Sequence, residues 1–101
     1  MDMRIYEHRT SLATTSGSTS TISLNVIGGV LRQLLIRAGT DTTVFRANIV
    51  DASSLTRRNW GFATREIDDE MAMPVAGRLT LNITNASPST DTFDVYMGVE
   101  E

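Results

Sequence analysis

The chain has 101 residues, no cysteine and a formal net charge of −3 at pH 7. This length fits a single domain, and without cysteine the chain has neither disulfides nor cysteine-based metal clusters. An acidic chain is a poor general nucleic-acid binder, because that function needs a basic surface to displace counterions. No apolar run approaches the ~20 residues of a membrane-spanning helix, and the first residues lack a signal-peptide core. We therefore expect synthesis in the cytoplasm and no membrane partner.

The nine basic residues are all arginine. Arginine is weakly hydrated and makes planar, forked contacts, so it suits interfaces better than lysine does, although GC-biased codon usage explains the same bias. In a domain of this size the hydrophobic gain and the entropic cost of folding nearly cancel, so a monomer without disulfides is marginally stable. Self-association is a common remedy, and we expect a homo-oligomer.

The first 20 residues differ in composition from the rest of the chain. Residues 3–8 (MRIYEH) are typical of a short strand or an extended arm. Residues 9–20 (RTSLATTSGSTS) are rich in serine and threonine, which predicts a flexible linker or an exposed extended segment. We divide the chain into an N-terminal arm with its Ser/Thr-rich segment (1–20) and a β-sandwich domain (21–101). The alternative for the arm is a strand within its own sandwich.

Two further strands are predicted on either side of a glycine pair. In residues 21–27 apolar and polar side chains alternate, which is the period of a half-buried strand. Gly28-Gly29 interrupts this pattern, and VLRQLLIRA (30–38) follows. The run is short, and we prefer a strand that is apolar on both faces to a helical stripe. Such a strand is either central in a sandwich or covered on its outer face by another subunit.

The middle of the chain predicts shorter elements. TDTT (40–43) is typical of a turn, and TVFRANIVD (43–51) alternates as a strand with its apolar side facing inward. Residues 51–61 (DASSLTRRNWG) are polar and predict a long connection, which a short strand at 62–65 follows. Pro74 indicates an edge strand or a bend.

The end of the chain gives the clearest pattern. Residues 78–83 and 93–99 both alternate apolar and polar side chains, and NASPSTD between them supplies turn residues. In total the sequence predicts seven or eight antiparallel strands and no helix. The expected fold is all-β: a small β-sandwich, of which the jelly roll is one form, with an extended N-terminal arm.

Little in the chain indicates catalysis or metal binding. His8 is the only histidine, and no GxSxG elbow or comparable support for a catalytic triad accompanies it. One histidine without cysteine cannot form a nitrogen/sulfur zinc site. The consecutive carboxylates Asp68, Asp69 and Glu70 match no calcium-loop spacing, and we interpret them as a solvated acidic loop or as partners for arginines across an interface. We expect no catalytic residue, no cofactor and no metal, and therefore a protein that is not an enzyme.

Arginine and tryptophan cluster in the predicted connection. Arg57, Arg58 and Trp60 are of the residue types most enriched at binding hot spots. The competing interpretation is that Trp60 plugs the open end of the core, with the arginines solvated around it.

The pattern as a whole resembles a known class of viral protein. An extended arm precedes the segment GGVLRQLLIRA (28–38), and the chain closes on the hairpin GRLTLNITNASPSTDTFDVYMGVE (77–100). In these features the chain resembles the small virion proteins of tailed bacteriophages, particularly head decoration (cement) proteins with a jelly-roll or β-sandwich fold. The resemblance implies a structural protein without an active site, a homotrimer on the outer surface of the capsid that bridges copies of the major capsid protein.

The resemblance also implies which segments contact a partner. The arm would add a strand to a neighbouring chain or to the capsid through main-chain hydrogen bonds, and the strand 30–38 would pack subunit against subunit. The alternative function is a phage tail or fibre module that recognises a host surface glycan or protein through the loop around Trp60. The predicted partner-binding residues are Arg4, Ile5 and Tyr6 of the arm, Leu31 and Leu35 of the strand, and Arg57, Arg58 and Trp60 of the connection.

Overall fold

A computed structural model describes residues 5–100 of the chain. These residues contain no helix, and therefore none that could cross a membrane. The prediction of an all-β fold is confirmed. The six strands are β1 (Ile5–Thr14), β2 (Thr19–Ala38), β3 (Val44–Val50), β4 (Thr56–Thr64), β5 (Glu66–Asn85) and β6 (Asp91–Glu100).

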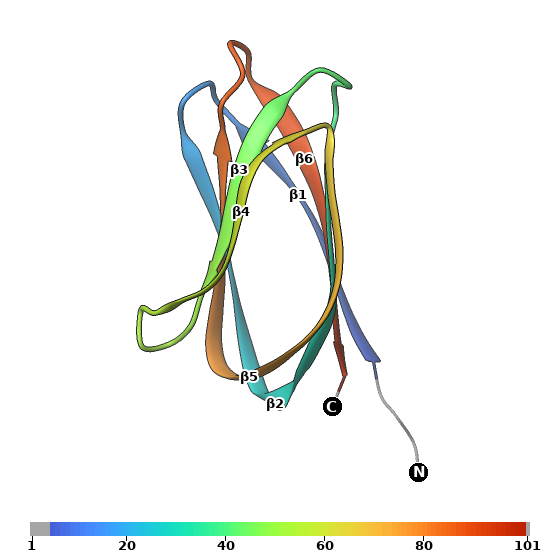
Figure 1. Cartoon of the computed structure of the whole chain (residues 1–101), viewed down its shortest axis with the longest axis vertical. Coiled ribbons are helices and arrows are strands. Elements are labelled where there is room, and N and C mark those ends of the chain that lie inside the picture. Colours follow the sequence, from blue (N-terminus) through green and yellow to red (C-terminus); the bar gives the residue numbers. More distant parts are fainter. Residues whose placement is uncertain (1–4, 101) are drawn as a thin grey trace.

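All six strands belong to one antiparallel sheet that folds onto itself (Figure 1). Their order in the sheet is β1-β6-β2-β5-β3-β4. The strands β2 and β5 have 20 residues each and pair with each other along most of their length. The first half of β2 lies against the second half of β5, and the second half of β2 against the first half of β5.

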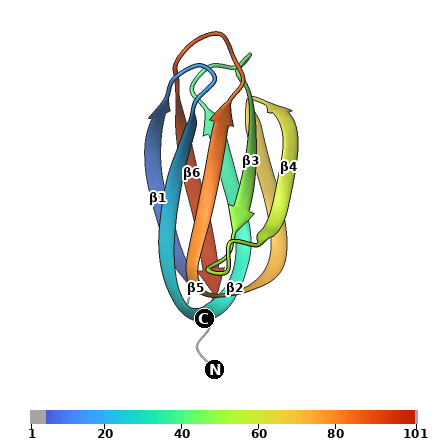
Figure 2. The same ribbon diagram turned by 90° about the vertical axis from the view of Figure 1, so that its left-hand side faces the viewer.

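The bend of this β2–β5 ribbon divides the sheet into two layers (Figures 1 and 2). In layer A, the second half of β2 pairs with β6 and with the first half of β5, and β1 pairs with the far side of β6. In layer B, the second half of β5 pairs with β3 and with the first half of β2, and β4 pairs with the far side of β3. The predicted β-sandwich is confirmed, and because β2 and β5 contribute to both layers, the six strands act as eight segments.

Glycines occupy the bend of the ribbon. The β2–β5 register shifts between Val26 and Gly29. A Cβ atom on Gly29 would lie 2.7 Å from the carbonyl oxygen of Glu100, so the end of β6 leaves no room for a side chain there. On β5, Gly77 has a φ of 77°, in the left-handed region that favours glycine. The glycine pair that interrupts the sequence pattern thus bends one strand and does not separate two.

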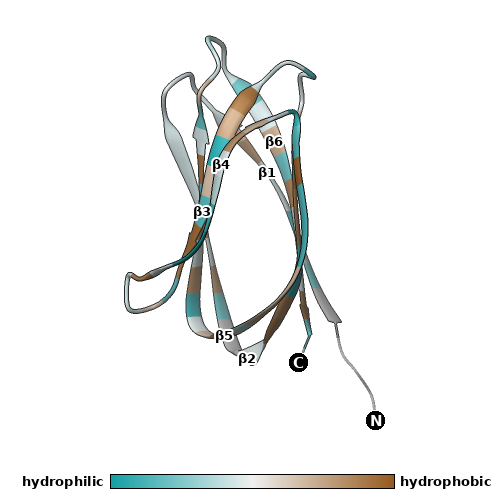
Figure 3. Cartoon of the chain, viewed as in Figure 1, coloured by the Kyte–Doolittle hydropathy of each residue, from teal (hydrophilic) through white to brown (hydrophobic). Residues whose placement is uncertain are grey.

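The core lies between the two layers. In β3, and over most of β5 and β6, every second side chain faces it, which appears as alternating brown and teal along β5 (Figure 3). The rings of Phe45 and Phe93 meet edge to face across the layers, with their centroids 5.0 Å apart. Ala47 and Ile49 are buried beside Phe45, as the alternation of residues 44–50 predicts.

The N-terminal segment is a strand of the sandwich and not a free arm. β1 pairs with β6 in unbroken register, from Ile5 opposite Glu100 to Thr14 opposite Asp91. The alternative interpretation, a strand in the protein's own sandwich, therefore describes residues 5–14. Leu12 explains the pairing, because it packs against the core although serine and threonine surround it. Residues 1–4 of the predicted arm lie outside the described part of the chain.

The connection predicted at 51–61 is wrong in its second half. The chain turns over residues 51–55, and β4 begins at Thr56. Most side chains of β4 are exposed because it is the edge strand of layer B, so burial imposes little alternation on its sequence. Pro74 lies in the half of β5 that pairs on one side, with β2, which agrees with the expected edge position for a residue without an N–H.

A buried asparagine joins the ends of several strands. Asn85 is 0% exposed, and its amide nitrogen donates to the carbonyl oxygens of Thr14 and Ser89 at 2.9 Å each. Its amide oxygen accepts hydrogen bonds from the N–H and the hydroxyl of Ser87. The end of β1 and the β5–β6 loop are thereby fixed to each other.

Candidate partner-binding face

The outer surface of layer A has an apolar centre inside a charged rim, and we call it the charged face. Leu35 and Tyr96 lie side by side at its centre, as register partners on β2 and β6. The charged face consists of Glu7, Arg9 and Ser11 of β1, Gln33, Leu35 and Arg37 of β2, Glu66, Asp68 and Glu70 of β5, and Asp94 and Tyr96 of β6.

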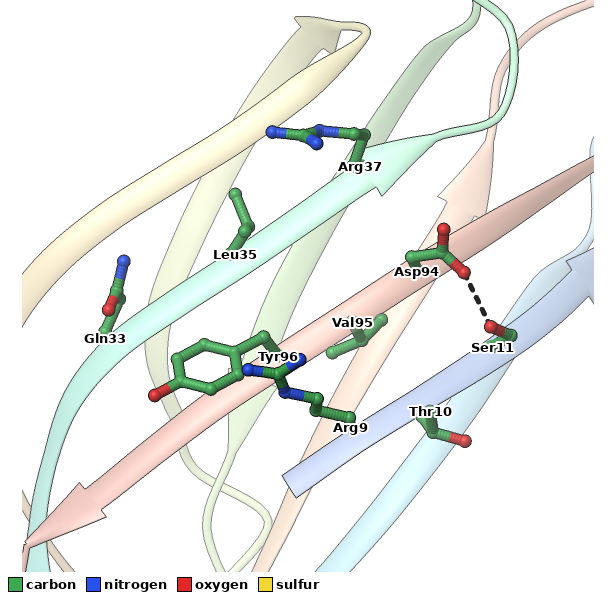
Figure 4. A pocket seen from close by; sticks show the side chains of 9 residues that line it. All are labelled: Arg9, Thr10, Ser11, Gln33, Leu35, Arg37, Asp94, Val95 and Tyr96. Carbon is green, nitrogen blue, oxygen red and sulfur yellow. Dashed lines mark hydrogen bonds between the residues drawn. The ribbon is translucent and has the colours of Figure 1, made fainter. Parts of the chain in front are cut away.

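An open hollow of about 570 Å³ lies on this face (Figure 4). Leu35 and Tyr96 are half-buried within it, and Arg9, Gln33 and Arg37 surround them. A partly apolar centre with a polar, solvated rim is the usual anatomy of a protein–protein interface. The hollow is therefore suited to a side chain of a partner protein.

Exposed polar contacts hold the rim together. The hydroxyl of Ser11 donates to Asp94 at 2.6 Å. The guanidinium of Arg9 lies 5.3 Å from the centroid of the Tyr96 ring and 3.7 Å from the carboxylate of Glu7. Exposed ion pairs contribute only about 0–1 kcal/mol each. A partner can therefore replace these contacts at little cost in stability.

The phenol of Tyr96 stays protonated on this face. Partial burial raises its pKa, the nearby Glu7 carboxylate raises it further, and Arg9 acts in the opposite direction. The Tyr96 hydroxyl donates to Glu7 at 3.3 Å. At neutral pH Tyr96 is therefore a neutral hydrogen-bond donor at the edge of the hollow.

The acidic residues predicted as one loop are part of a strand and point in two directions. Asp68 accepts a hydrogen bond from Gln33 at 3.3 Å on the charged face. Asp69 points the other way and accepts from Arg58 at 2.7 Å and from the indole N–H of Trp60 at 2.9 Å. Within residues 5–100, no group of three histidines, cysteines or carboxylates is placed to hold a metal ion.

Of the two leucines predicted to bind a partner, only Leu35 reaches the charged face. Leu31 is 0% exposed and belongs to the core. In a regular strand two residues four apart share a face, but the register shift between Leu31 and Gln33 inserts a bulge. The bulge turns the rest of β2, so that Leu35 points outward.

The remaining predicted residues lie elsewhere. Arg57, Arg58 and Trp60 are on β4, at the seam where layer B meets the first half of β5. Trp60 is half-buried and packs against the core, and the Arg58 guanidinium lies 5.8 Å from the centroid of its ring. For Ile5 and Tyr6 the structure describes the backbone, which pairs with β6, and Arg4 lies outside the described residues.

Tyr96 and Arg9 are the residues of this face that the sequence analysis did not single out. The alternation of residues 93–99 already places Tyr96 opposite the apolar side of its strand, which is a signal for an exposed aromatic residue. Nothing in the sequence brings Arg9 next to Tyr96, because that contact depends on the pairing of the first strand with the last.

The fold has counterparts in virus structures. A chain in the structure of the cyanophage Pam1 capsid asymmetric unit superposes with a TM-score of 0.57 over 98% of this chain and 84% of that chain, at 13% identity. A chain in the structure of infectious bursal disease virus, Gt strain, has a TM-score of 0.48 over 97% of this chain and 32% of that chain, at 17% identity. The superposition on the Pam1 chain, at 13% identity, establishes the fold alone: this chain is a small β-sandwich like that chain of the phage capsid structure. No protein-family model and no curated protein sequence matches the chain.

Proposed function

We propose that this protein is a structural component of a virus particle that decorates and stabilises the capsid by bridging copies of the major capsid protein, without an enzymatic activity. The observation that carries the proposal is the superposition on the cyanophage Pam1 chain, which covers 98% of this chain and 84% of the other. Because both chains are covered almost completely, the Pam1 chain consists of little more than the same single domain.

The order of the strand segments supports a jelly roll. Across layer A the segments follow the order β1, β6, second half of β2, first half of β5. Across layer B the order is first half of β2, second half of β5, β3, β4. This order results when an antiparallel ribbon wraps around a core, and such double-sheet jelly rolls are common among viral capsid domains.

We assign the charged face to the contact with the shell or with a neighbouring copy, in a homotrimer. Its half-buried Leu35 and Tyr96 would form the centre of the contact, and its arginines and carboxylates the solvated rim. Arginine and tyrosine are also the types that dominate binding energy at such centres. A virion location on the capsid surface follows from this assignment.

The test is addition of the purified protein to empty capsid shells of the virus that encodes it. We expect saturable, stoichiometric addition, measured by density-gradient sedimentation and gel densitometry. Light scattering of the free protein is expected to give three times the chain mass of 11.1 kDa. A wild-type protein that does not add to the shells at any concentration would contradict the proposal.

A matched pair of variants on β2 tests which face makes the contact. Leu35→Arg places a charge at the centre of the charged face, and Ser23→Arg places the same residue on the outer side of layer B. Loss of a central hot-spot residue costs about 2 kcal/mol or more, so Leu35→Arg is expected to weaken shell binding or self-association about 30-fold. Ser23→Arg is expected to leave both unchanged, and equal effects of the two variants would refute the assignment of the face.

A further inference from the structure

The outer surface of layer B is rich in threonine and asparagine, with Arg46 on β3 and Arg78 on β5 as charged residues, and we call it the Thr/Asn face. Figure 2 looks onto this layer. One row of register partners crosses all four of its strands. The row consists of Thr21 of β2, Asn82 of β5, Asn48 of β3 and Asn59 of β4.

Hydrogen bonds fix the amides of this row. Thr21 donates its hydroxyl proton to the amide oxygen of Asn82 at 2.8 Å, and the amide nitrogen of Asn82 donates to the amide oxygen of Asn48 at 2.9 Å. These bonds leave the amide nitrogen of Asn48 directed away from the network. Within residues 5–100, no side-chain hydrogen bond involves the amide of Asn59. The row therefore presents to a ligand the oriented amide nitrogen of Asn48 and the exposed amide of Asn59.

A hollow of about 250 Å³ opens at this row. Its volume lies just below the usual range for ligand sites, about 300–1,000 Å³, and so suits one small ring. No carboxylate is among its lining residues, and its one charged group is the guanidinium of Arg46. The hollow is lined by Arg46, Ala47, Asn48, Asn59, Asn82 and Thr84.

An exposed aromatic ring stands beside the hollow. Phe62 is 71% exposed, and the Arg46 guanidinium lies 5.9 Å from the centroid of its ring. Its chain neighbour Gly61 has nothing within 4 Å of the place where a side chain would begin. The phenyl ring is therefore exposed next to Arg46, a residue that also lines the hollow.

We propose that this hollow binds one ring of a saccharide and prefers a ring that carries a carboxylate. The apolar C–H face of a sugar packs on the open ring of Phe62, while its hydroxyl groups pair with the amides of Asn48 and Asn59, which both donate and accept. Arg46 binds the carboxylate through its forked N–H donors. The aromatic ring, the two amides and the guanidinium each match one part of such a sugar.

A protein partner fits this surface less well. Protein interfaces have a contiguous aromatic or aliphatic centre. Among the side chains that the structure describes, the large exposed apolar ones are Phe62 and the distant loop residue Leu55. Around Phe62 the Thr/Asn face offers amides and hydroxyls. A single apolar ring is too small a centre for a protein, yet it is as large as one face of a sugar. The proposal does not depend on the capsid role.

The first experiment is a glycan array of neutral and acidic saccharides, probed with the biotinylated full chain on labelled streptavidin so that weak sites act together. The control is the variant Phe62→Ala, which is expected to keep the melting temperature of the wild type because the ring is exposed. We expect the wild type to retain acidic glycans and Phe62→Ala to lose them. If both proteins give the same signal on every glycan, the proposal is wrong.

A second experiment locates the site by NMR titration with hyaluronan tetrasaccharide as the acidic probe and chitotetraose as the neutral one. We expect shifts in the side-chain amides of Asn48 and Asn59, and a dissociation constant that rises about tenfold in Phe62→Ala. Arg46→Gln is expected to remove the preference for the acidic probe, and Leu35→Ala on the charged face to change nothing. Saccharide shifts confined to the charged face would overturn the assignment. So would a Phe62→Ala variant that loses shell binding or self-association while the wild type binds no saccharide, because the face would then be a protein interface.

Discussion

The two outer faces of the sandwich differ in chemistry although the same two strands, β2 and β5, run through both. Before the bend of β2 its outward residues are hydroxyl or amide side chains such as Thr21, and after it they include Leu35 and Arg37. On β5 the change is reversed, from carboxylates such as Asp68 to neutral residues such as Asn82. The composition of the outward positions therefore switches where the ribbon turns, so that one chain builds two surfaces of different chemistry.

The contacts within the two faces differ as well. On the charged face they include ion pairs, such as Arg37 and Glu66 at 3.5 Å, and such exposed pairs weaken as salt screens them. On the Thr/Asn face they join neutral groups, such as Thr19 and Thr84 at 2.8 Å, and they respond little to salt. A partner of the charged face is expected to bind in a salt-dependent manner, and a saccharide ring on the Thr/Asn face is expected to do so only through Arg46.

The largest expected effect compares two asparagines on opposite sides of layer B. Asn85→Ala leaves the carbonyl oxygens of Thr14 and Ser89 without their buried donor, and we expect a loss of about 3 kcal/mol in the free energy of unfolding. Asn82→Ala removes bonds that water can replace on the surface and is expected to cost less than about 1 kcal/mol. Urea unfolding measures both. Equal losses would mean that the amides of the Thr/Asn face are structural and not available to a ligand.

The second prediction concerns the bend that separates the faces. Gly29→Ala brings a Cβ atom to 2.7 Å from the carbonyl oxygen of Glu100, and overpacking of this kind costs about 1–3 kcal/mol. Gly28→Ala is the matched control, because nothing lies within 4 Å of the added atom, and we expect it to change stability by less than about 1 kcal/mol. The comparison of their urea midpoints checks this. A Gly28→Ala variant that is as unstable as Gly29→Ala would contradict the described bend.

The third prediction concerns the carboxylate of Asp91, which begins β6 and contacts the loop between β2 and β3. Burial opposes ionisation of Asp91, but hydrogen bonds from the hydroxyl of Thr43 and the N–H groups of Thr92 and Thr40 outweigh it and lower the pKa of its carboxyl group. The unfolded chain binds this proton more readily than the folded chain does. The contribution of Asp91 to the free energy of unfolding is therefore present when the pH is above the ordinary pKa, and it is lost as the pH falls through the lowered pKa. At pH 7, Asp91→Asn is therefore expected to cost about 1 kcal/mol.

The pH dependence distinguishes this effect from a packing defect. Thermal unfolding of the wild type and Asp91→Asn from neutral to acidic pH should show the two stabilities converging as the wild-type carboxylate takes up its proton. A difference that stays constant down to the acid limit would show that charge is not its cause.

The smallest expected effect is a change of pKa on the charged face itself. Burial is the largest cause of the raised pKa of Tyr96, and the Glu7 carboxylate is the second. Glu7→Gln removes the second cause, so the phenol should titrate closer to its ordinary pKa. Ultraviolet absorbance of the phenolate, in a Tyr6→Phe background, measures the midpoint. Asp94→Asn, which removes another carboxylate of the same face, is the control and should shift the midpoint less.

The sequence predicts the parts of this fold in which burial imposes alternation. In residues 44–50 and 93–99 most of the alternate side chains face the core. The sequence therefore shows an alternation of apolar and polar residues in both segments. β4 is not predicted in full, because an edge strand with exposed side chains carries no such period. For the region of β1 the sequence leaves alternatives open, a short strand or an arm at residues 3–8 and a linker or an extended segment at 9–20, and only pairing with β6 decides between them.

The candidate site is predictable to a smaller extent. Leu31 and Leu35 are both predicted as contact residues, and the sequence does not separate the buried one from the exposed one, because the bulge between them leaves no mark in it. The neighbourhood of Tyr96 and Arg9 depends on strands at opposite ends of the chain. Likewise, Asn48 and Asn82 form one row only through the register of β3 with β5.

The central claim is that the charged face contacts the shell or a neighbouring copy while the Thr/Asn face remains in solvent. Electron cryomicroscopy of shells saturated with this protein tests it most directly. The account predicts density in which Leu35 and Tyr96 are covered by a neighbouring chain and Phe62 is open to water. Density in which the Thr/Asn face lies against the shell and the charged face is solvated would contradict it.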